Sequence, residues 1–231
     1  MKYNKVVITG GSSGIGLELA HLLQANGCQV VVLSRSVGQL AEGVLHIPTD
    51  LRDLGSIEAA FDQLGSIDAL VNNAGIAYKS SMIDGDLREW DEMWEVNVRA
   101  LGYCSQLALR AFPDSGGQIV NVSSMSGHRV PPSGGFYSPT KFAVRAMSEA
   151  LRLELRARGS MTRISSVSPG FVDTPLLDTY FKGREEQLQQ TKETIQMLQP
   201  EDIARQILHI LETPLVVEIG DIGLRSVGQS V

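Results

Sequence analysis

Short aliphatic runs alternate with longer amphipathic segments along nearly the whole chain, and this alternation is the main signal of its fold. A run of four to eight aliphatic residues is typical of a buried strand, whereas apolar residues three or four positions apart indicate a helix. Strands are predicted at Lys5–Thr9, Gln29–Leu33, Val44–Ile47, Ile67–Val71, Gln118–Ser123, Arg163–Val167 and Val216–Ile219. Helical patterns occupy about 17–26, 57–64, 87–112, 137–158 and 200–213.

Strands that alternate with helices predict an α/β fold in which helices cover both faces of a parallel sheet. We therefore expect a three-layer α/β/α, doubly wound Rossmann-type sheet of about seven strands, formed by a single domain over residues 1–231. Trp90 and Trp94, in the pattern at 87–112, are expected in the core. The segment 171–199 mixes apolar and charged residues and is typical of a mobile substrate flap, although a plain surface helix has the same pattern.

Composition and charge narrow the class of protein. The chain has 231 residues, a net charge of −6 and a pI near 5.3, without a basic cluster, so nucleic acid is not an expected partner. No stretch is apolar and long enough to span a membrane, and the first residues lack a signal-peptide pattern, which predicts a cytoplasmic protein. Cys28 and Cys104 stand alone without Cys/His clusters, so neither a disulfide nor a metal site is expected.

A glycine-rich turn joins the first predicted strand to the first helix. Its residues are Gly10, Gly11, Ser12, Ser13, Gly14, Ile15 and Gly16. Glycines allow backbone N–H groups to approach a pyrophosphate closely, and the start of the helix adds a partial positive charge. The turn therefore predicts a dinucleotide site, although the same residues could form a tight turn without a ligand.

The residues that follow the second and third predicted strands bear on which nucleotide is bound. The second strand is followed by Ser34 and Arg35, with no carboxylate to accept a ribose hydroxyl. A guanidinium binds a 2′-phosphate, so NADP(H) is favoured over NAD(H), unless Arg35 is only a solvated loop charge. Asp50, followed by Leu51, could accept from the adenine amino group or cap the helix that follows.

The fourth strand ends in Asn72, Asn73, Ala74 and Gly75. The small residues would let the backbone lie against a cofactor, although the sequence could also be merely a turn. Further along, Asn97 is a polar residue among apolar ones on a helix expected to be buried. A buried amide requires hydrogen-bond partners.

A serine hydroxyl, a phenol and an amine, which are suited to proton transfer, come close together in the sequence. Ser123 and Ser124 end a buried strand, where ligands bind in open α/β sheets. Tyr137 and Lys141 are one helical turn apart, so the ammonium can lie beside the phenol. A free tyrosine has a pKa of about 10, and a nearby positive charge would lower that pKa toward the neutral range.

With these residues in place, the chain resembles the short-chain dehydrogenase/reductase family over nearly its whole length. The shared signals occur in family order and are Thr9-Gly10-x-x-x-Gly14-x-Gly16, Asn72-Asn73-Ala74-Gly75, Asn97, Ser124, Tyr137-x-x-x-Lys141 and Pro169-Gly170. The resemblance implies an oxidoreductase that uses a nicotinamide cofactor. It also implies Ser124, not Ser123, as the catalytic hydroxyl, because the gap to Tyr137 matches the family.

The family's residue roles carry over to matching positions. Tyr137 would be the acid or base, Ser124 would bind the reacting oxygen, Lys141 would contact Tyr137 and the nicotinamide ribose, and Asn97 would hold a water. Cofactor contacts are implied for Asp50 and Leu51 at adenine, Asn73 near its ribose, and Val172 and Thr174, after Pro169 and Gly170, at the nicotinamide. Ser34-Arg35 resembles NADP-preferring members, whereas Ser13 replaces a second basic residue that some of them carry.

The substrate class follows from a closer similarity. Met125–Pro131, Leu198–Asp202 and Ile219–Ile222 resemble a branch of carbonyl reductases that includes steroid 17-beta and 3-beta reductases and farnesol dehydrogenases. This implies an apolar alcohol or ketone of small to medium size. Reduction of a 3-oxoacyl thioester, supported by Arg129, Arg145 and Arg152, and an NADP(H)-binding regulator are the alternatives. Family members commonly form homodimers or homotetramers through the helices around 100–112 and 137–158.

Overall fold

The computed structural model describes residues 3–132 and 134–229, in which the strands form one parallel sheet. The strand order is β3-β2-β1-β4-β5-β6-β7. The strands are β1 (Lys5–Thr9), β2 (Gln29–Ser34), β3 (Leu45–Pro48), β4 (Ala69–Asn72), β5 (Gln118–Val122), β6 (Arg163–Pro169) and β7 (Asp221–Leu224). The expected seven-stranded, doubly wound Rossmann-type sheet is confirmed.

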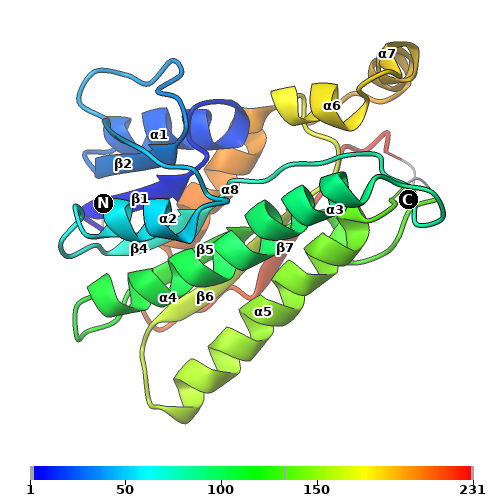
Figure 1. Ribbon diagram of the computed structural model, residues 1–231. Coiled ribbons are helices and arrows are strands. Elements are labelled where there is room, and N and C mark those ends of the chain that lie inside the picture. Colours follow the sequence, from blue (N-terminus) through cyan, green and yellow to red (C-terminus); the bar gives the residue numbers. More distant parts are fainter. Residues whose placement is uncertain (1–2, 133, 230–231) are drawn as a thin grey trace.

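Helices cover both faces of this sheet (Figure 1). They are α1 (Gly14–Ala25), α2 (Leu54–Phe61), α3 (Leu87–Trp94), α4 (Leu101–Ala111), α5 (Tyr137–Ala157), α6 (Pro175–Tyr180), α7 (Glu185–Thr194) and α8 (Pro200–Glu212). Helices α1 and α8 pack together on one face, and α2, α4 and α5 lie on the other. The helix predicted from Pro200 begins there, with the Asp202 carboxylate accepting from the Gln199 N–H at 2.7 Å.

The two faces of the central strands supply two separate hydrophobic cores. On β1, Val6 and Ile8 pack with α1 and α8, whereas Val7 packs with α2 and α4. Successive side chains of a strand point to opposite faces, so a strand that is apolar at every position must be covered on both sides. This is the physical reason that continuous aliphatic runs in the sequence correspond to the inner strands of a three-layer fold.

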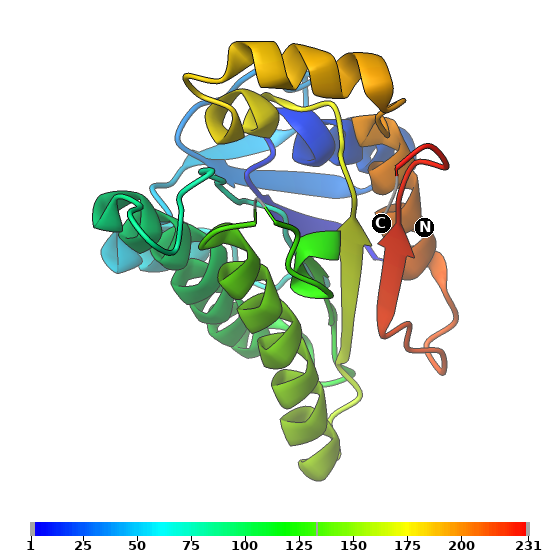
Figure 2. The same ribbon diagram turned by 90° about the vertical axis from the view of Figure 1, so that its right-hand side faces the viewer.

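The path of the chain reverses beside β1. The first strands are added on one side of β1, through β2 to β3, and the following ones on the other side, beginning with β4. At such a point the connections diverge to opposite faces and leave a crevice outside the carboxyl ends of the strands. Figure 2 shows the sheet after rotation, with β7, in red, beside β6.

The last strand lies later in the chain than expected. Val216–Ile219 is a loop, and pairing with β6 begins at Asp221. Side chains occupy the backbone groups that would pair there. The guanidinium of the buried Arg163 donates to the carbonyl of Val217 at 2.6 Å, and the Glu218 carboxylate accepts from the Ile164 N–H of β6 at 2.8 Å. These groups are therefore not available for backbone pairing between β6 and this stretch.

The helix expected over 87–112 is not regular. A π-helical turn, Glu95–Ala100, separates α3 from α4, and Asn97 lies within this turn. Trp94 is 46% exposed, so its prediction as a core residue was wrong; Trp90 is partly buried and stacks on the Phe136 ring with centroids 4.6 Å apart. Insertions of this kind redirect side chains and often occur at functional sites.

Candidate active site

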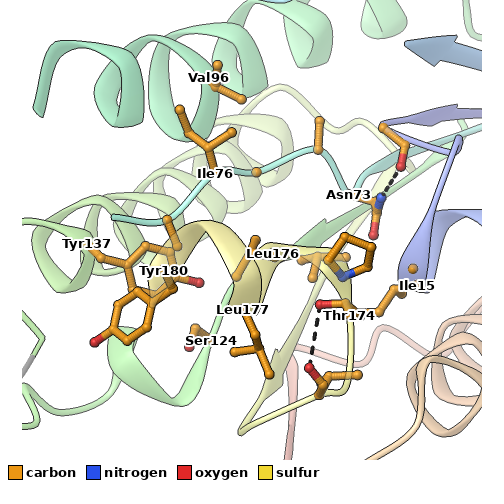
Figure 3. Close-up of a pocket in the computed structure, with 18 of the residues that line it drawn as sticks. Ile15, Asn73, Ile76, Val96, Ser124, Tyr137, Thr174, Leu176, Leu177 and Tyr180 are labelled. Carbon is orange, nitrogen blue, oxygen red and sulfur yellow. Dashed lines mark hydrogen bonds between the residues drawn. The ribbon is translucent and has the colours of Figure 1, made fainter. Parts of the chain in front are cut away.

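A cavity of about 510 Å³ lies at the carboxyl ends of the strands. Its walls come from the turns after β1, β2, β4, β5 and β6 and from α6. Ser124, Tyr137 and Tyr180 lie at one end, whereas Ile15 and Asn73 lie toward the other (Figure 3). The fold therefore brings the predicted glycine turn and the predicted proton-transfer residues into one continuous site, although they are far apart in the sequence.

The glycine turn has the conformation that its sequence predicts. Gly10 and Gly14 have φ angles of 68° and 54°, which side chains disfavour. A Cβ on Gly10 would lie 2.7 Å from the Cα of Ala74, and one on Gly16 would lie 2.4 Å from the amide nitrogen of Asn73. The turn after β1 thus packs directly against the turn after β4, and no side chain fits between them.

The start of α1 is open toward the cavity. Ser13 precedes the helix in an extended conformation but makes no side-chain cap, and the first turn contains no acidic residue. Ser12, Ser13, Gly14 and Ile15 all line the cavity. The first N–H groups of a helix have no partner within the helix, so this end is suited to an anion such as a pyrophosphate.

Asn73 holds the two turns in place. Its side-chain amide donates to the carbonyls of Thr9 and Gly10 at 3.1 and 2.9 Å, as Figure 3 shows in part. The Thr9 hydroxyl accepts from the backbone N–H of Ala74 at 3.1 Å. From the sequence, Thr9 was noted only as the first residue of the glycine motif. Its hydroxyl contacts the turn after β4 because β1 pairs with β4.

Arg35 is exposed at the edge of the cavity beside Ser34. Its side chain makes no hydrogen bond or ion pair with any residue that the structure describes. The Ser34 hydroxyl, by contrast, is engaged, because it donates to the carbonyl of Ser36 at 2.7 Å. Arg35 is thus an uncommitted cation at the point where the second strand leaves the sheet.

Asp50 lines the same edge but does not cap the following helix. The cap of α2 is Asp53, whose carboxylate accepts from the Gly55 N–H at 2.9 Å. Asp50 instead pairs with Arg52, with 2.8 Å between Oδ2 and the guanidinium nitrogen, and this contact lowers the pKa of Asp50 to about 2. The capping alternative was therefore wrong, because Asp53 is the residue that directly precedes the helix. The neighbouring Leu51 is buried and lines the cavity.

Asn97 finds its hydrogen-bond partners in the turn after β4. Its amide oxygen accepts from the Ile76 N–H and its amide nitrogen donates to the Ile76 carbonyl, both at 2.9 Å. It also donates to the Thr140 hydroxyl at 3.2 Å. A Cβ on Gly75 would lie 3.4 Å from the Asn97 oxygen and 3.6 Å from the Lys141 amine. Asn97 thus ties the cofactor-side turn to α5.

Lys141 is almost fully buried beside Tyr137. Its amine lies 5.7 Å from the centroid of the Tyr137 ring and donates to the carbonyl of Val122 at 2.9 Å. Burial lowers the pKa of Lys141 to about 8, because the charged amine loses hydration there. The helical spacing therefore places the two groups on one face, as predicted.

Tyr137 departs from expectation in its ionisation. Burial raises the pKa of its phenol above the ordinary value, and a hydrogen bond with Ser124 only partly opposes this effect. A lowered pKa was expected from the Lys141 charge, but the amine is directed to the carbonyl of Val122. In this structure the phenol is therefore held in its neutral, proton-bearing form at physiological pH.

The two serines at the end of β5 have different environments. Ser123 is buried, and its hydroxyl donates to the Lys141 carbonyl at 3.3 Å. The Ser124 hydroxyl lines the cavity, accepts from the Ser126 N–H at 3.1 Å and donates weakly to the Pro169 carbonyl at 3.5 Å. Both serines line the cavity, but Ser124 is the one whose hydroxyl interacts with the Tyr137 phenol.

The turn after β6 folds back over the glycine turn. Thr174 precedes α6, and its hydroxyl donates to the Val172 carbonyl at 3.5 Å (Figure 3). A Cβ on Gly14 would lie 3.1 Å from the methyl group of Thr174. Pro169, Gly170, Val172 and Thr174 all line the cavity, as the resemblance implies for the nicotinamide end.

The expected flap, 171–199, divides into two parts. Helix α6 places Leu177 and Tyr180 in the cavity wall, and the Tyr180 ring meets that of Tyr137 edge to face, with centroids 6.2 Å apart. Helix α7 has no buried residue and matches the surface-helix alternative. It contacts the loop after β4, because the Lys79 amine of that loop donates to the Gln187 side chain at 2.9 Å.

Gln229 lines the cavity and was not predicted from the sequence. Its side-chain oxygen accepts from the Phe171 N–H at 3.1 Å, and a Cβ on Gly170 would lie 2.2 Å from that oxygen. No motif marks this residue, since it reaches the site only because β7 pairs with β6. Tyr78 was also missed; its hydroxyl donates to the Glu92 carboxylate at 2.7 Å, and both residues line the cavity.

Comparison with known proteins decides the family. The model of the family described as short chain dehydrogenase matches residues 4–185. The chain belongs to the short-chain dehydrogenase/reductase family. It is 37% identical to the cattle protein named dehydrogenase/reductase SDR family member 11 over 245 aligned positions, which cover 96% of each chain. The human protein of the same name is 36% identical, over 96% of this chain and 94% of the relative.

A solved structure with a similar fold is consistent with this assignment. The closed form of a serine dehydrogenase complexed with NADP+ superposes with a TM-score of 0.91 at 26% sequence identity, over 98% of this chain and 96% of the other. Members of the family are oxidoreductases that use a nicotinamide cofactor. Among the described residues, no helix of this short-chain dehydrogenase/reductase is both long and apolar enough to cross a membrane. No group of His, Cys, Asp or Glu suited to a metal ion occurs in residues 3–132 and 134–229.

Proposed function

We propose that this short-chain dehydrogenase/reductase interconverts an alcohol and a carbonyl compound with NADP(H), and that Tyr137 is the acid or base. One observation carries the proposal. A single cavity holds the Ser124 hydroxyl, the Tyr137 phenol and the Lys141 amine at one end, and the open helix start and Arg35 at the other. This arrangement suits a reaction in which a bound dinucleotide places its reactive ring beside a proton donor.

The residues present fit a dinucleotide. The backbone cradle of the glycine turn would hold the pyrophosphate, because any Cβ at Gly10 or Gly16 would collide with its neighbours. Asn73, Ala74 and Gly75 would line the adenosine ribose, and Pro169, Gly170, Val172 and Thr174 would enclose the nicotinamide. When bound, the cofactor supplies or accepts the hydride.

The chain's own residues would manage the proton. Tyr137 carries its proton at physiological pH, so it could donate to a carbonyl oxygen during reduction. Because burial raises the pKa of the phenol, this transfer would need a nearby positive charge to stabilise the phenolate. Ser124 would donate a second hydrogen bond to the same oxygen as negative charge develops there. The charged Lys141 amine would stabilise the phenolate that remains, and Asn97 would hold a water that reconnects Lys141 with solvent.

The charges at the adenosine end favour NADP(H). The Arg35 side chain has no hydrogen-bond or ion-pair partner among the residues that the structure describes, whereas the carboxylate of Asp50 is already paired with Arg52. A 2′-phosphate would therefore meet an available cation without an uncompensated anion beside it. The NADP+ bound to the similar serine dehydrogenase is consistent with this preference. Because Arg52 already offsets the nearest carboxylate, a basic residue in place of Ser13 would not be required for this preference.

The substrate end of the cavity is mainly apolar. Beside Ser124 it is walled by the side chains of Met125, Pro131, Phe171, Leu177 and Tyr180. Such walls favour the small to medium apolar ketone or alcohol that the sequence predicts. The similarity to dehydrogenase/reductase SDR family member 11 supports a substrate with a carbonyl or hydroxyl group.

The alternative, a 3-oxoacyl thioester delivered by an acidic carrier, loses most of its support. Arg145 donates to the Gly127 carbonyl at 2.8 Å, and Arg152 forms an ion pair with Glu149 at 2.6 Å. Both cations therefore have structural partners. Arg129 lines the cavity without a hydrogen-bond or ion-pair partner for its side chain among the described residues, but one cation is a small docking surface for an acidic protein.

Assembly through α4 and α5 is also proposed. Trp94, at the end of α3, and Phe142 and Leu153, on α5, are exposed apolar residues. Leu155 is buried in the internal core, and Leu107 and Leu151 are partly buried against that core, so they offer less surface for that contact. A homodimer or homotetramer would cover the exposed residues. A cytoplasmic location stays a prediction from the sequence.

The proposal is tested by NADPH and NADH oxidation with a panel of ketones, aldehydes and one 3-oxoacyl thioester. Tyr137→Phe should lower kcat by at least about a hundredfold while NADPH affinity changes little. Arg35→Ala should reduce the NADPH over NADH preference by about tenfold or more. Arg205→Ala, outside the cavity on the surface of α8, is the matched control.

Each outcome has one interpretation. Full activity of Tyr137→Phe would refute its role as the acid, and an unchanged preference in Arg35→Ala would refute its role at the 2′-phosphate. Faster turnover of the thioester than of every ketone would favour the carrier alternative. Tight NADPH binding with no carbonyl turnover in any case would favour a nucleotide-binding regulator.

A further inference from the structure

A polar cluster outside the cavity joins the loop after Ser124 to the last two strands. His128 lies in that loop, and its Nε2 is 2.9 Å from Oδ2 of Asp221, the first residue of β7. The other carboxylate oxygen, Oδ1, accepts from the hydroxyl of Ser168 at 2.8 Å. One carboxylate therefore links three segments that are far apart in the sequence. Figure 2 shows two of them, β6 and β7, side by side.

The His128 end of this cluster is connected to Ser124 by a short, rigid turn. Ser124 begins a 3-10 turn, Met125–Gly127, in which the Gly127 N–H donates to the Ser124 carbonyl at 2.9 Å. The His128 N–H donates to the Met125 carbonyl at 3.0 Å. Because these hydrogen bonds leave the turn little freedom, holding the His128 side chain also holds the backbone of Ser124.

The Ser168 end reaches Ser124 from the opposite side. Ser168 is fully buried in β6 and directly precedes Pro169, whose carbonyl accepts from the Ser124 hydroxyl at 3.5 Å. That distance is long for a hydroxyl donor, so the hydroxyl is free to turn toward a substrate oxygen. Asp221 thus sets the separation between the two groups that flank the Ser124 side chain.

The chemistry of the cluster explains why these residue types are needed. A carboxylate has two acceptor oxygens and can accept from His128 and Ser168 together, whereas an asparagine offers one acceptor and one donor. The side chains of His128 and Asp221 are 29% and 26% exposed, so their contact is partly shielded from water. Neither side chain belongs to the hydrophobic cores, and truncating either one opens no apolar cavity.

We propose that His128 and Asp221 are positioning residues for the reaction: together with Ser168 they clamp the loop after β5 to β6 and β7 and so aim the Ser124 hydroxyl at the substrate oxygen. The clamp rests on the proposed function, because aiming Ser124 matters only if Ser124 binds the reacting oxygen. It acts on the chemical step, whereas the glycine turn and the start of α1, which would hold the pyrophosphate, lie toward the other end of the cavity.

The test uses the full chain with NADPH and the best carbonyl from the panel. The variants are His128→Ala, Asp221→Ala, their double variant, and His128→Gln, whose side-chain N–H can replace the imidazole donor. Arg205→Ala is the matched control, because it removes an ion pair with Glu201, at 2.6 Å, on the surface of α8. Kinetics, NADPH binding by fluorescence, and hydrogen exchange of residues 124–131 are measured for each.

His128→Ala and Asp221→Ala should each lower kcat about tenfold, as displacement of a reacting group by a fraction of an ångström does. The double variant should lose no more than either single variant, since both break the same clamp. His128→Gln should recover most of the wild-type kcat. The NADPH affinity of every variant should stay within about twofold of the wild-type value. Hydrogen exchange of residues 124–131 should rise in the alanine variants only.

Losses that multiply in the double variant, an unchanged kcat, or a loss that appears only as weaker NADPH binding would overturn the clamp. If His128→Ala does not fold, His128→Gln decides alone: wild-type exchange and kcat support the clamp, and a loss as large as that of Asp221→Ala refutes it. A wild-type protein that reduces no carbonyl refutes the proposed function, whereas an active wild type with unaffected variants refutes only the clamp.

Discussion

Replacing Lys141 with methionine should make the protein more stable at neutral pH while it removes a proposed catalytic group. The side chain is nearly fully buried and lies on α5 against the end of β5. Methionine has a similar length and needs no hydration. The substitution therefore isolates what it costs the fold to keep an ammonium group inside the active site.

The magnitude follows from the pKa. Burial lowers the pKa of Lys141 from an ordinary 10.5 to about 8. At about 1.4 kcal/mol per pKa unit, keeping the amine charged at about pH 7 costs the folded state about 3 kcal/mol. The hydrogen bond to the Val122 carbonyl, which methionine loses, returns about 1.5 kcal/mol. The variant should thus gain about 1–2 kcal/mol in free energy of unfolding.

The pH dependence gives the sharper test. Between about pH 8 and 10.5 the unfolded chain binds the lysine proton and the folded chain does not, so the stability contribution of Lys141 rises with pH in this window. At about pH 9.5 the cost has fallen to about 1.4 kcal/mol. The advantage of the methionine variant should therefore shrink by about 2 kcal/mol between about pH 7 and 9.5.

The assay is urea unfolding of wild type and Lys141→Met at both pH values, because other titrating groups cancel in the difference. Lys182→Met, at an exposed lysine, is the control for the loss of one positive charge. An advantage that stays the same at both pH values would refute the reasoning, since it would show that packing and not buried charge separates the two proteins.

Other predictions follow from the same site. Gly10→Ala, which would place a Cβ 2.7 Å from the Cα of Ala74 at a φ of 68°, should cost about 1–3 kcal/mol of stability and weaken NADPH binding; unchanged affinity in a fluorescence titration would contradict the cradle. Asn97→Ala leaves the N–H and carbonyl of Ile76 unpaired and should cost about 1–3 kcal/mol in urea unfolding, whereas a change below about 0.5 kcal/mol would show that water replaces the amide. Carbonyl reduction should decline as pH rises through about 8, where Lys141 loses its proton; a pH profile of kcat/KM that is flat through this range would refute the need for that charge.

Local patterns were enough to predict the sheet and the nucleotide-facing turns. A buried parallel strand is apolar at every position, as in β1 and β2, and this pattern does not depend on distant residues. Gly10 and Gly14 are equally local signals, because their φ angles exclude most side chains. The helical spacing of Tyr137 and Lys141 likewise predicts, without any tertiary contact, that the two groups lie on one face of a helix.

The tertiary structure decided what depends on contacts between distant segments. Arg163 binds the Val217 carbonyl and Glu218 binds the Ile164 N–H, so pairing with β6 begins only at Asp221, whose carboxylate contacts His128. Lys141 is directed to the Val122 carbonyl, so burial and not charge sets the pKa of Tyr137. Sequence periodicity reports which side of an element is buried. It carries no information on which distant polar groups share that space, because hydrogen bonds and desolvation depend on the packed arrangement of the whole chain.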